Sequence, residues 1–132
     1  MSLPSLTING RRIATDEPPY IIAELSANPN GSLETALELV DRAAACGADA
    51  IKLQTYRPGT ITLDSDREDF LIHDGLWKNR RLFELYEEAH LPWEWHANLF
   101  ERAKTRGITA FSSVFDETAV DFLEDLGTPG YK

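Results

Sequence analysis

Cysteine and basic residues are scarce in this chain of 132 residues, and each scarcity excludes a class of protein. Cys46 is the only cysteine, so no disulfide can form within the chain, and its place at the end of an alanine-rich stretch predicts a small packed thiol. Lysine and arginine number 13 against 22 acidic residues. The net charge of -9 argues against a general affinity for nucleic acid or for anionic membranes.

Long apolar runs and metal-ligand spacings are missing too. No stretch is long enough to span a bilayer, and no basic start leads into an apolar leader segment, so we expect a cytoplasmic protein. No two of the three histidines, His73, His90 and His96, have the spacing that puts two ligands on one helix face. We expect surface or packing roles for them, and no metal site within this chain.

A recurring pattern indicates the fold class. Three times a helix-like stretch meets a glycine and then a short apolar strand, at 45–54, 106–113 and 126–132, and an earlier strand covers 20–25. This pattern predicts a parallel α/β fold with its chemistry at the carboxyl ends of the strands. Because a closed (β/α)8 TIM barrel takes about 250 residues, we expect the N-terminal half of one, with a fourth strand just beginning at Lys132.

Two further segments complete the expected organisation. Asn9-Gly10 between short apolar runs is a strong hairpin signal, so residues 1–19 are predicted to form a β-hairpin and linker, and residues 20–132 the first βα units. More than fifty residues separate the strand at 50–54 from the next one, and so long an excursion is usually functional. We expect Trp77, Trp93 and Trp95 to anchor this excursion to the body of the protein.

Polar residues at strand ends are the candidate site. A strand buried in a parallel sheet is usually a continuous run of apolar residues. Burial of the Lys52 charge between Ile51 and Leu53 therefore costs free energy unless something binds it, and the same holds for Glu24. Alternation places Lys52 and Gln54 on one face of their strand, and Ser113 ends the next strand along the chain. In a barrel this shared face points inward at the mouth.

Several separated motifs carry a family resemblance. Residues 20–132 are similar to the N-terminal half of the sialic acid synthase family, and most closely to its bacterial pseudaminic acid synthases. The matching motifs lie at 21–28, 47–56, 75–77, 85–86, 93–96, 111–116 and 131–132. The chain departs from the usual pattern at Pro29, where a histidine is common, and at Val114, where a proline is common.

The resemblance implies a reaction and an assembly. Family members condense phosphoenolpyruvate with the aldehyde of an N-acetylated amino sugar, which yields a nine-carbon sialic-acid-like sugar and phosphate. The implied fold is a TIM barrel followed by a small antifreeze-like domain, in a domain-swapped homodimer. The implied cofactor is a divalent metal, Mn or Mg, whose histidine ligands are expected in the second half of the barrel, outside this chain.

Carried over residue by residue, the resemblance implies individual roles. Lys52, Ser113 and Lys132 match positions that hold phosphoenolpyruvate, and Gln54 matches a position near the amino sugar. Glu24 matches a position close to the reacting groups. From the residues alone, Glu24 either orients or deprotonates the attacking water, or forms an ion pair with Lys52 across neighbouring strands.

Other functions stay open at this point. Within the family, the chain is also compatible with an N-acetylneuraminate or legionaminate synthase. Outside it, Lys52 could form a Schiff base in an aldolase. A noncatalytic fragment or remnant that binds small phosphorylated ligands or a partner subunit is a further alternative, and for these 132 residues alone we expect inactivity.

Overall fold

A three-stranded parallel sheet forms the centre of the protein, whose computed structural model describes residues 4–132. The strands β3 (Ile22–Glu24), β4 (Ala50–Thr55) and β5 (Thr109–Val114) are hydrogen-bonded in this order. Tyr131 continues the series, because it forms a parallel bridge with Ser112 on the free side of β5. The predicted parallel α/β architecture is confirmed, although β3 is shorter than the expected strand at 20–25.

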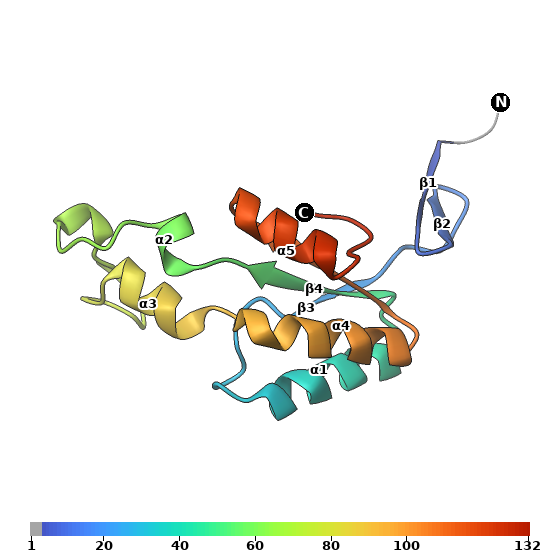
Figure 1. Cartoon of the computed structure of the whole chain (residues 1–132), viewed down its shortest axis with the longest axis horizontal. Coiled ribbons are helices and arrows are strands. Elements are labelled where there is room, and N and C mark those ends of the chain that lie inside the picture. The colour runs from blue at the N-terminus through green and yellow to red at the C-terminus, as the bar shows by residue number, and fades with distance from the viewer. Residues whose placement is uncertain (1–3) are drawn as a thin grey trace.

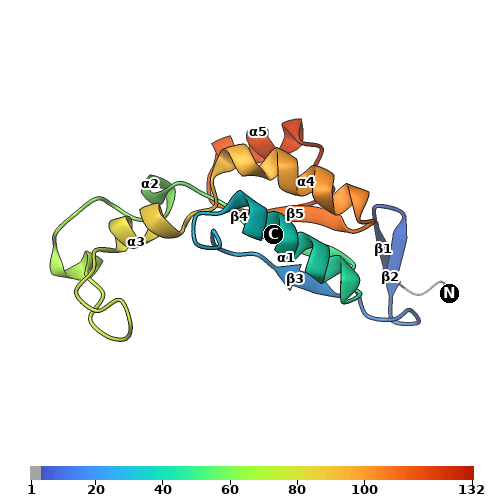
Figure 2. The same cartoon turned by 90° about the horizontal axis from the view of Figure 1, so that it is seen from below.

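Three helices cover the sheet. The helices α1 (Leu33–Ala45) and α4 (His96–Thr105) lie side by side on it, and α5 (Glu117–Asp125) packs on β5 (Figures 1 and 2). The apolar faces of α1 and α4 meet one face of the sheet in a core made of Leu25, Ala36, Val40, Ile51, Leu53, Leu91, Leu99, Ala103 and Ala110. Within residues 4–132, no helix has the length and apolar character needed to cross a membrane.

Local signals set the ends of these helices. Ser32 caps α1 because its hydroxyl accepts a hydrogen bond from the backbone N–H of Thr35 at 3.1 Å. Gly47 ends the helix in the left-handed conformation, with φ +85°. The expected packing of Cys46 is wrong, because this thiol is exposed. It lies six residues after the buried Val40, which turns it well away from the face of α1 that contacts the sheet.

The predicted hairpin forms from β1 (Ser5–Ile8) and β2 (Arg11–Ala14), which pair antiparallel. Asn9 and Gly10 both have positive φ, as the tight turn requires. The side chain of Asn9 donates to the Thr109 hydroxyl at 3.1 Å, at the first residue of β5. The hairpin therefore lies at the amino ends of the strands, away from the predicted mouth (Figure 1). Residues 1–3 of the predicted N-terminal segment lie outside the described residues.

The excursion after β4 extends beyond the carboxyl ends of the strands (Figure 1). It contains the helices α2 (Pro58–Ile61) and α3 (Leu82–Ala89) and two 3₁₀ turns, η1 (Glu68–Phe70) and η2 (Trp93–Trp95). Trp93 anchors it as predicted: its indole N–H donates to the Tyr56 carbonyl at 3.0 Å, and its ring packs on Phe122 of α5. The expected anchoring is wrong for Trp77, because this residue is 51% exposed.

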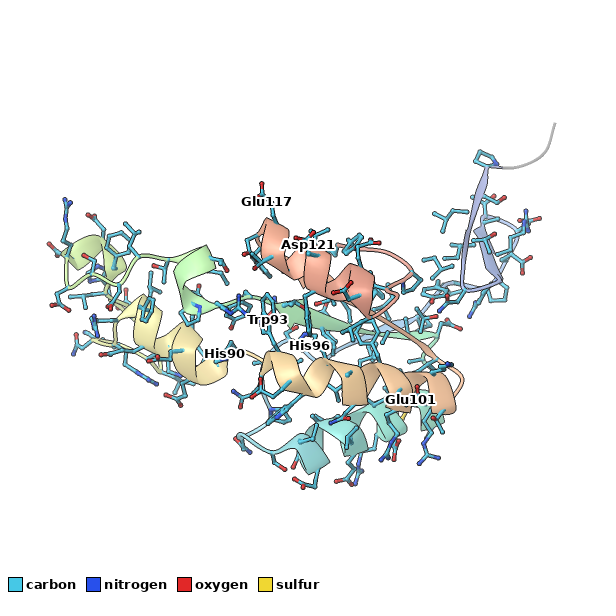
Figure 3. All side chains as sticks on the ribbon, viewed as in Figure 1. His90, Trp93, His96, Glu101, Glu117 and Asp121 are labelled. Carbon is cyan, nitrogen blue, oxygen red and sulfur yellow. The ribbon has the colours of Figure 1, made fainter. Side chains whose placement is uncertain are left out.

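His96 has the packing role predicted for it. The ring lies between α4 and α5 (Figure 3). It is fully buried and contacts Phe122 edge to face. Nδ1 donates to the Pro92 carbonyl at 3.2 Å, so Nε2 accepts from the Thr55 hydroxyl at 2.9 Å. Thr55 in turn lies 2.7 Å from the Ser112 hydroxyl. Burial lowers the pKa of His96, because the charged imidazolium is poorly solvated there.

This lowered pKa predicts a pH-dependent stability. Below pH 6.5, the ordinary histidine pKa, His96 takes up a proton in the unfolded chain more readily than in the folded chain. The contribution of His96 to the free energy of unfolding is therefore present above pH 6.5 and is lost as the pH falls. At pH 7.5, His96→Gln should lower the free energy of unfolding by about 1–3 kcal/mol. At pH 5.5, urea denaturation should show a smaller difference from wild type.

The exposed His73 offers a matched control. His73→Gln should leave the free energy of unfolding close to wild type at both pH values. A difference between wild type and His96→Gln that stays the same at pH 7.5 and pH 5.5 would contradict the assignment of this pH dependence to His96.

Candidate active site

The predicted polar residues of the three strands share one face of the sheet. Glu24 lies opposite Lys52 in the pairing of β3 with β4, and Gln54 lies opposite Ser113 in the pairing of β4 with β5. Side chains two residues apart on a strand point to the same side. The strand residues between them pack against the helices, so these four polar residues lie on the face of the sheet turned away from the helices. The four residues are therefore neighbours at the carboxyl ends of the strands, as predicted. We call this region the mouth.

Lys52 and Glu24 form an ion pair across neighbouring strands. Lys52 Nζ lies 2.8 Å from Glu24 Oε1, and the two side chains are 7% and 60% exposed. The hydrogen bond from Lys52 lowers the pKa of Glu24, so this carboxylate is ionised at neutral pH. The ion pair that we considered for Glu24 is thus present. Its exposed carboxylate also remains accessible from the mouth.

Lys132 joins the same region through the bridge beyond β5. Its backbone N–H donates to the Ser112 carbonyl at 3.1 Å, which places it beside Ser113 in the continued parallel pairing. The positive charge of Lys132 also lowers the pKa of Glu24, although less than Lys52 does. Two ammonium groups therefore act on one carboxylate. The mouth combines opposite charges with the capacity to bind a further anion.

Ser113 carries a buried hydroxyl that nothing in residues 4–132 satisfies. The residue is 6% exposed, and its Oγ has no hydrogen-bond partner. A buried polar group without a partner is costly, and in a site it marks a position where a ligand can donate or accept. The half-buried Gln54 lies opposite it and adds an amide.

An aromatic cluster lies just past the carboxyl ends of β4 and β5 and was not foreseen from the sequence. Tyr56, which follows β4, has its ring centroid 5.9 Å from that of Tyr86, 6.4 Å from that of His90 and 5.5 Å from that of Phe115. Two of these rings come from α3 and its end, and Phe115 follows β5. We call the four rings the aromatic cluster. Their chain positions gave no periodic signal because they lie on three separate segments.

The residues at 4–132 do not by themselves make a metal site. Across positions 4–132, no three histidine, cysteine, aspartate or glutamate side chains gather closely enough to hold an ion. The mouth offers one carboxylate, which is already paired with Lys52. The chemistry that it supports directly is anion binding with a hydroxyl and an amide close by.

Comparison with known proteins identifies the family. A sequence model described as NeuB family matches residues 39–132, which is most of the chain. The chain belongs to the NeuB family. It is 53% identical over 118 residues to the pseudaminic acid synthase of Campylobacter jejuni serotype O:2, covering 89% of this chain and 34% of that protein. It is 47% identical over 116 residues to the Helicobacter pylori pseudaminic acid synthase, covering 88% and 34%.

Solved structures confirm that the parallel βα units of this NeuB-family chain match part of a TIM barrel. The N-acetylneuraminic acid synthetase of Leptospira borgpetersenii superposes with a TM-score of 0.76 at 25% identity, over 96% of this chain and 39% of that one. The Bacillus subtilis spore coat polysaccharide biosynthesis protein SpsE gives a TM-score of 0.71 at 26% identity, over 97% and 32%. The chain spans about a third of the length of the curated relatives it matches.

The adjacent serines of β5 allow a test of the two sheet faces. The Ser112 hydroxyl lies 2.7 Å from the Thr55 hydroxyl, whereas Ser113 Oγ is unpaired within the described part of the chain. Ser112→Ala should therefore lower the free energy of unfolding by about 1–2 kcal/mol. Ser113→Ala, measured in the same urea titration, should match wild type or exceed it. Equal losses in the two variants would show that Ser113 has a partner in the folded chain.

Proposed function

We propose that this chain provides the phosphoenolpyruvate-binding half of a pseudaminic acid synthase-like active site. The observation that carries the proposal is the meeting of Glu24, Lys52 and Ser113 on one face of the sheet, with Lys132 alongside. The relatives with the highest identities quoted above, 53% and 47%, are named pseudaminic acid synthases. An N,N'-diacetyllegionaminic acid synthase from Legionella pneumophila is 35% identical, so its reaction is a weaker alternative.

Each residue has a proposed role toward the substrates. Phosphoenolpyruvate carries a carboxylate and a phosphate, and we assign these anionic groups to the ammonium ions of Lys52 and Lys132. The unpaired hydroxyl of Ser113 donates to one of the ligand's oxygens. Gln54, next to it in the pairing of β4 and β5, binds the amino sugar through its amide.

The proposed reaction forms one carbon–carbon bond and breaks one bond to phosphate. The methylene carbon of phosphoenolpyruvate attacks the sugar aldehyde, whose oxygen takes up a proton and becomes a hydroxyl. Water adds to the carbon that bears the phosphate, and loss of inorganic phosphate leaves a ketone there. Glu24 has a lowered pKa and is a weak base, so we assign it to orienting this water by accepting its hydrogen bond.

The wider assembly is also part of the proposal. A divalent Mn or Mg ion would need ligands from outside the residues described here, so no step above is assigned to it. We propose that these residues act within a cytoplasmic homodimer, in which each protomer completes its own barrel with further βα units. Residues 1–19 and 20–132 would then serve as the hairpin with its linker and as the first βα units.

Lys52→Met tests the proposal in a chimera in which this chain replaces the matching 34% of the Campylobacter jejuni enzyme. Loss of one charge-assisted contact should lower kcat/KM for phosphoenolpyruvate by roughly 10- to 100-fold, measured as phosphate release. Lys104→Met, which removes an exposed lysine on α4, should leave this value within about twofold of the parent chimera. Unchanged KM and kcat in Lys52→Met would reject the assignment.

The same chimera distinguishes the alternative functions. An aldolase that uses Lys52 as a Schiff base would be trapped covalently by borohydride with a carbonyl substrate, whereas the proposed synthase would not. A parent chimera that releases no phosphate with any N-acetylated amino-sugar aldehyde, under Mn or Mg, would favour a noncatalytic remnant and overturn the proposed function.

A further inference from the structure

Asn28 joins two segments that are sixty residues apart in the chain. It lies in the loop between β3 and α1, and its side-chain Nδ2 donates to the carbonyl of Glu88 at 2.6 Å and to that of His90 at 3.0 Å. Its backbone N–H donates to the carbonyl of Ala89 at 3.0 Å. Its Oδ1 accepts from the backbone N–H of Gly31 at 2.9 Å, which holds the loop itself.

These bonds complete the C-terminal cap of α3. The last four carbonyls of a helix have no partner within the helix. In α3 the carbonyls of Tyr86 and Glu87 accept from the backbone N–H and from Nδ1 of His90. The other two, of Glu88 and Ala89, accept from Asn28. Half of the cap therefore comes from the loop that follows β3 rather than from the excursion.

The cap connects the two sides of the mouth. The loop of Asn28 begins directly after β3, and Ser26 in it donates to Glu24 Oε2 at 3.3 Å. At the other end of the cap, the His90 ring contacts Tyr56, two residues after Gln54. The positions of Tyr86 and His90 in the aromatic cluster, relative to Gln54 and Glu24, thus depend on the bonds that Asn28 makes.

We propose that Asn28 is a positioning residue that fixes Tyr86 and His90, the α3 side of the aromatic cluster, as the sugar-side wall of the mouth. The inference rests on the proposed function, because it assigns the cluster to the side of Gln54. The groups assigned to phosphoenolpyruvate lie on β4, β5 and the bridge beyond β5, which are held by the sheet and do not depend on the cap. Loosening the cap should therefore affect the sugar far more than phosphoenolpyruvate.

Asn28→Asp is the test, because it replaces the donor Nδ2 by an oxygen that repels the two carbonyls it faces. In the chimera, KM for the amino sugar should rise about 10-fold, whereas KM for phosphoenolpyruvate should stay within about twofold. Asn30→Asp is the matched control: it makes the same change of charge in the same loop, and the Asn30 side chain makes no hydrogen bond within the described residues. It should leave both constants unchanged.

Hydrogen exchange on the 132-residue chain supplies a readout that does not require activity. Asn28→Asp should raise amide exchange in 26–31 and 86–91 together, with no change in the hairpin at 5–14, and Asn30→Asp should change none of these segments. Faster exchange in 26–31 alone would contradict the claim that Asn28 caps α3. An equal rise of both KM values would contradict the assignment of the aromatic cluster to the sugar side. An inactive parent chimera would instead overturn the proposed function, and with it the assignment to sugar, whatever the exchange shows.

Discussion

The ion pair between Lys52 and Glu24 is the interaction on which the mouth depends. Lys52 lies on the central strand of the sheet with 7% of its side chain exposed, and a charge so placed needs a partner. Parallel pairing supplies one at the same level of the adjacent strand. Because Glu24 remains 60% exposed, the pair is open on one side, where its charges can act on a ligand.

Alternation along β5 places its two adjacent serines in different surroundings. Ser112 points toward the helices, where Thr55 and the buried His96 ring complete a chain of hydrogen bonds. Ser113 points the other way, and its Oγ has no hydrogen-bond partner among residues 4–132. Two identical and adjacent residues thus differ in their hydrogen bonding because successive side chains face opposite sides of a sheet.

Most of the local structure could be predicted because its causes are local. The hairpin follows from Asn9-Gly10, and the start of α1 follows from the hydroxyl of Ser32. The candidate residues Glu24, Lys52, Gln54 and Ser113 could be found because a polar residue in an apolar strand is conspicuous. The predictions failed for Cys46 and Trp77. The exposure of Cys46 depends on where the buried face of α1 ends, and the exposure of Trp77 depends on the path of an irregular segment.

The sequence by itself determined the elements, the faces of the strands and the polar ends that meet at the mouth, because spacing along a strand fixes the side to which each residue points. Only the tertiary structure decided that Asn28 caps α3 and that Tyr56, Tyr86, His90 and Phe115 form one cluster. The Asn28 cap bonds reach backbone carbonyls, which every residue type carries, so no side chain in the excursion marks the partner. Contacts of this kind exist only once the chain has brought distant segments together.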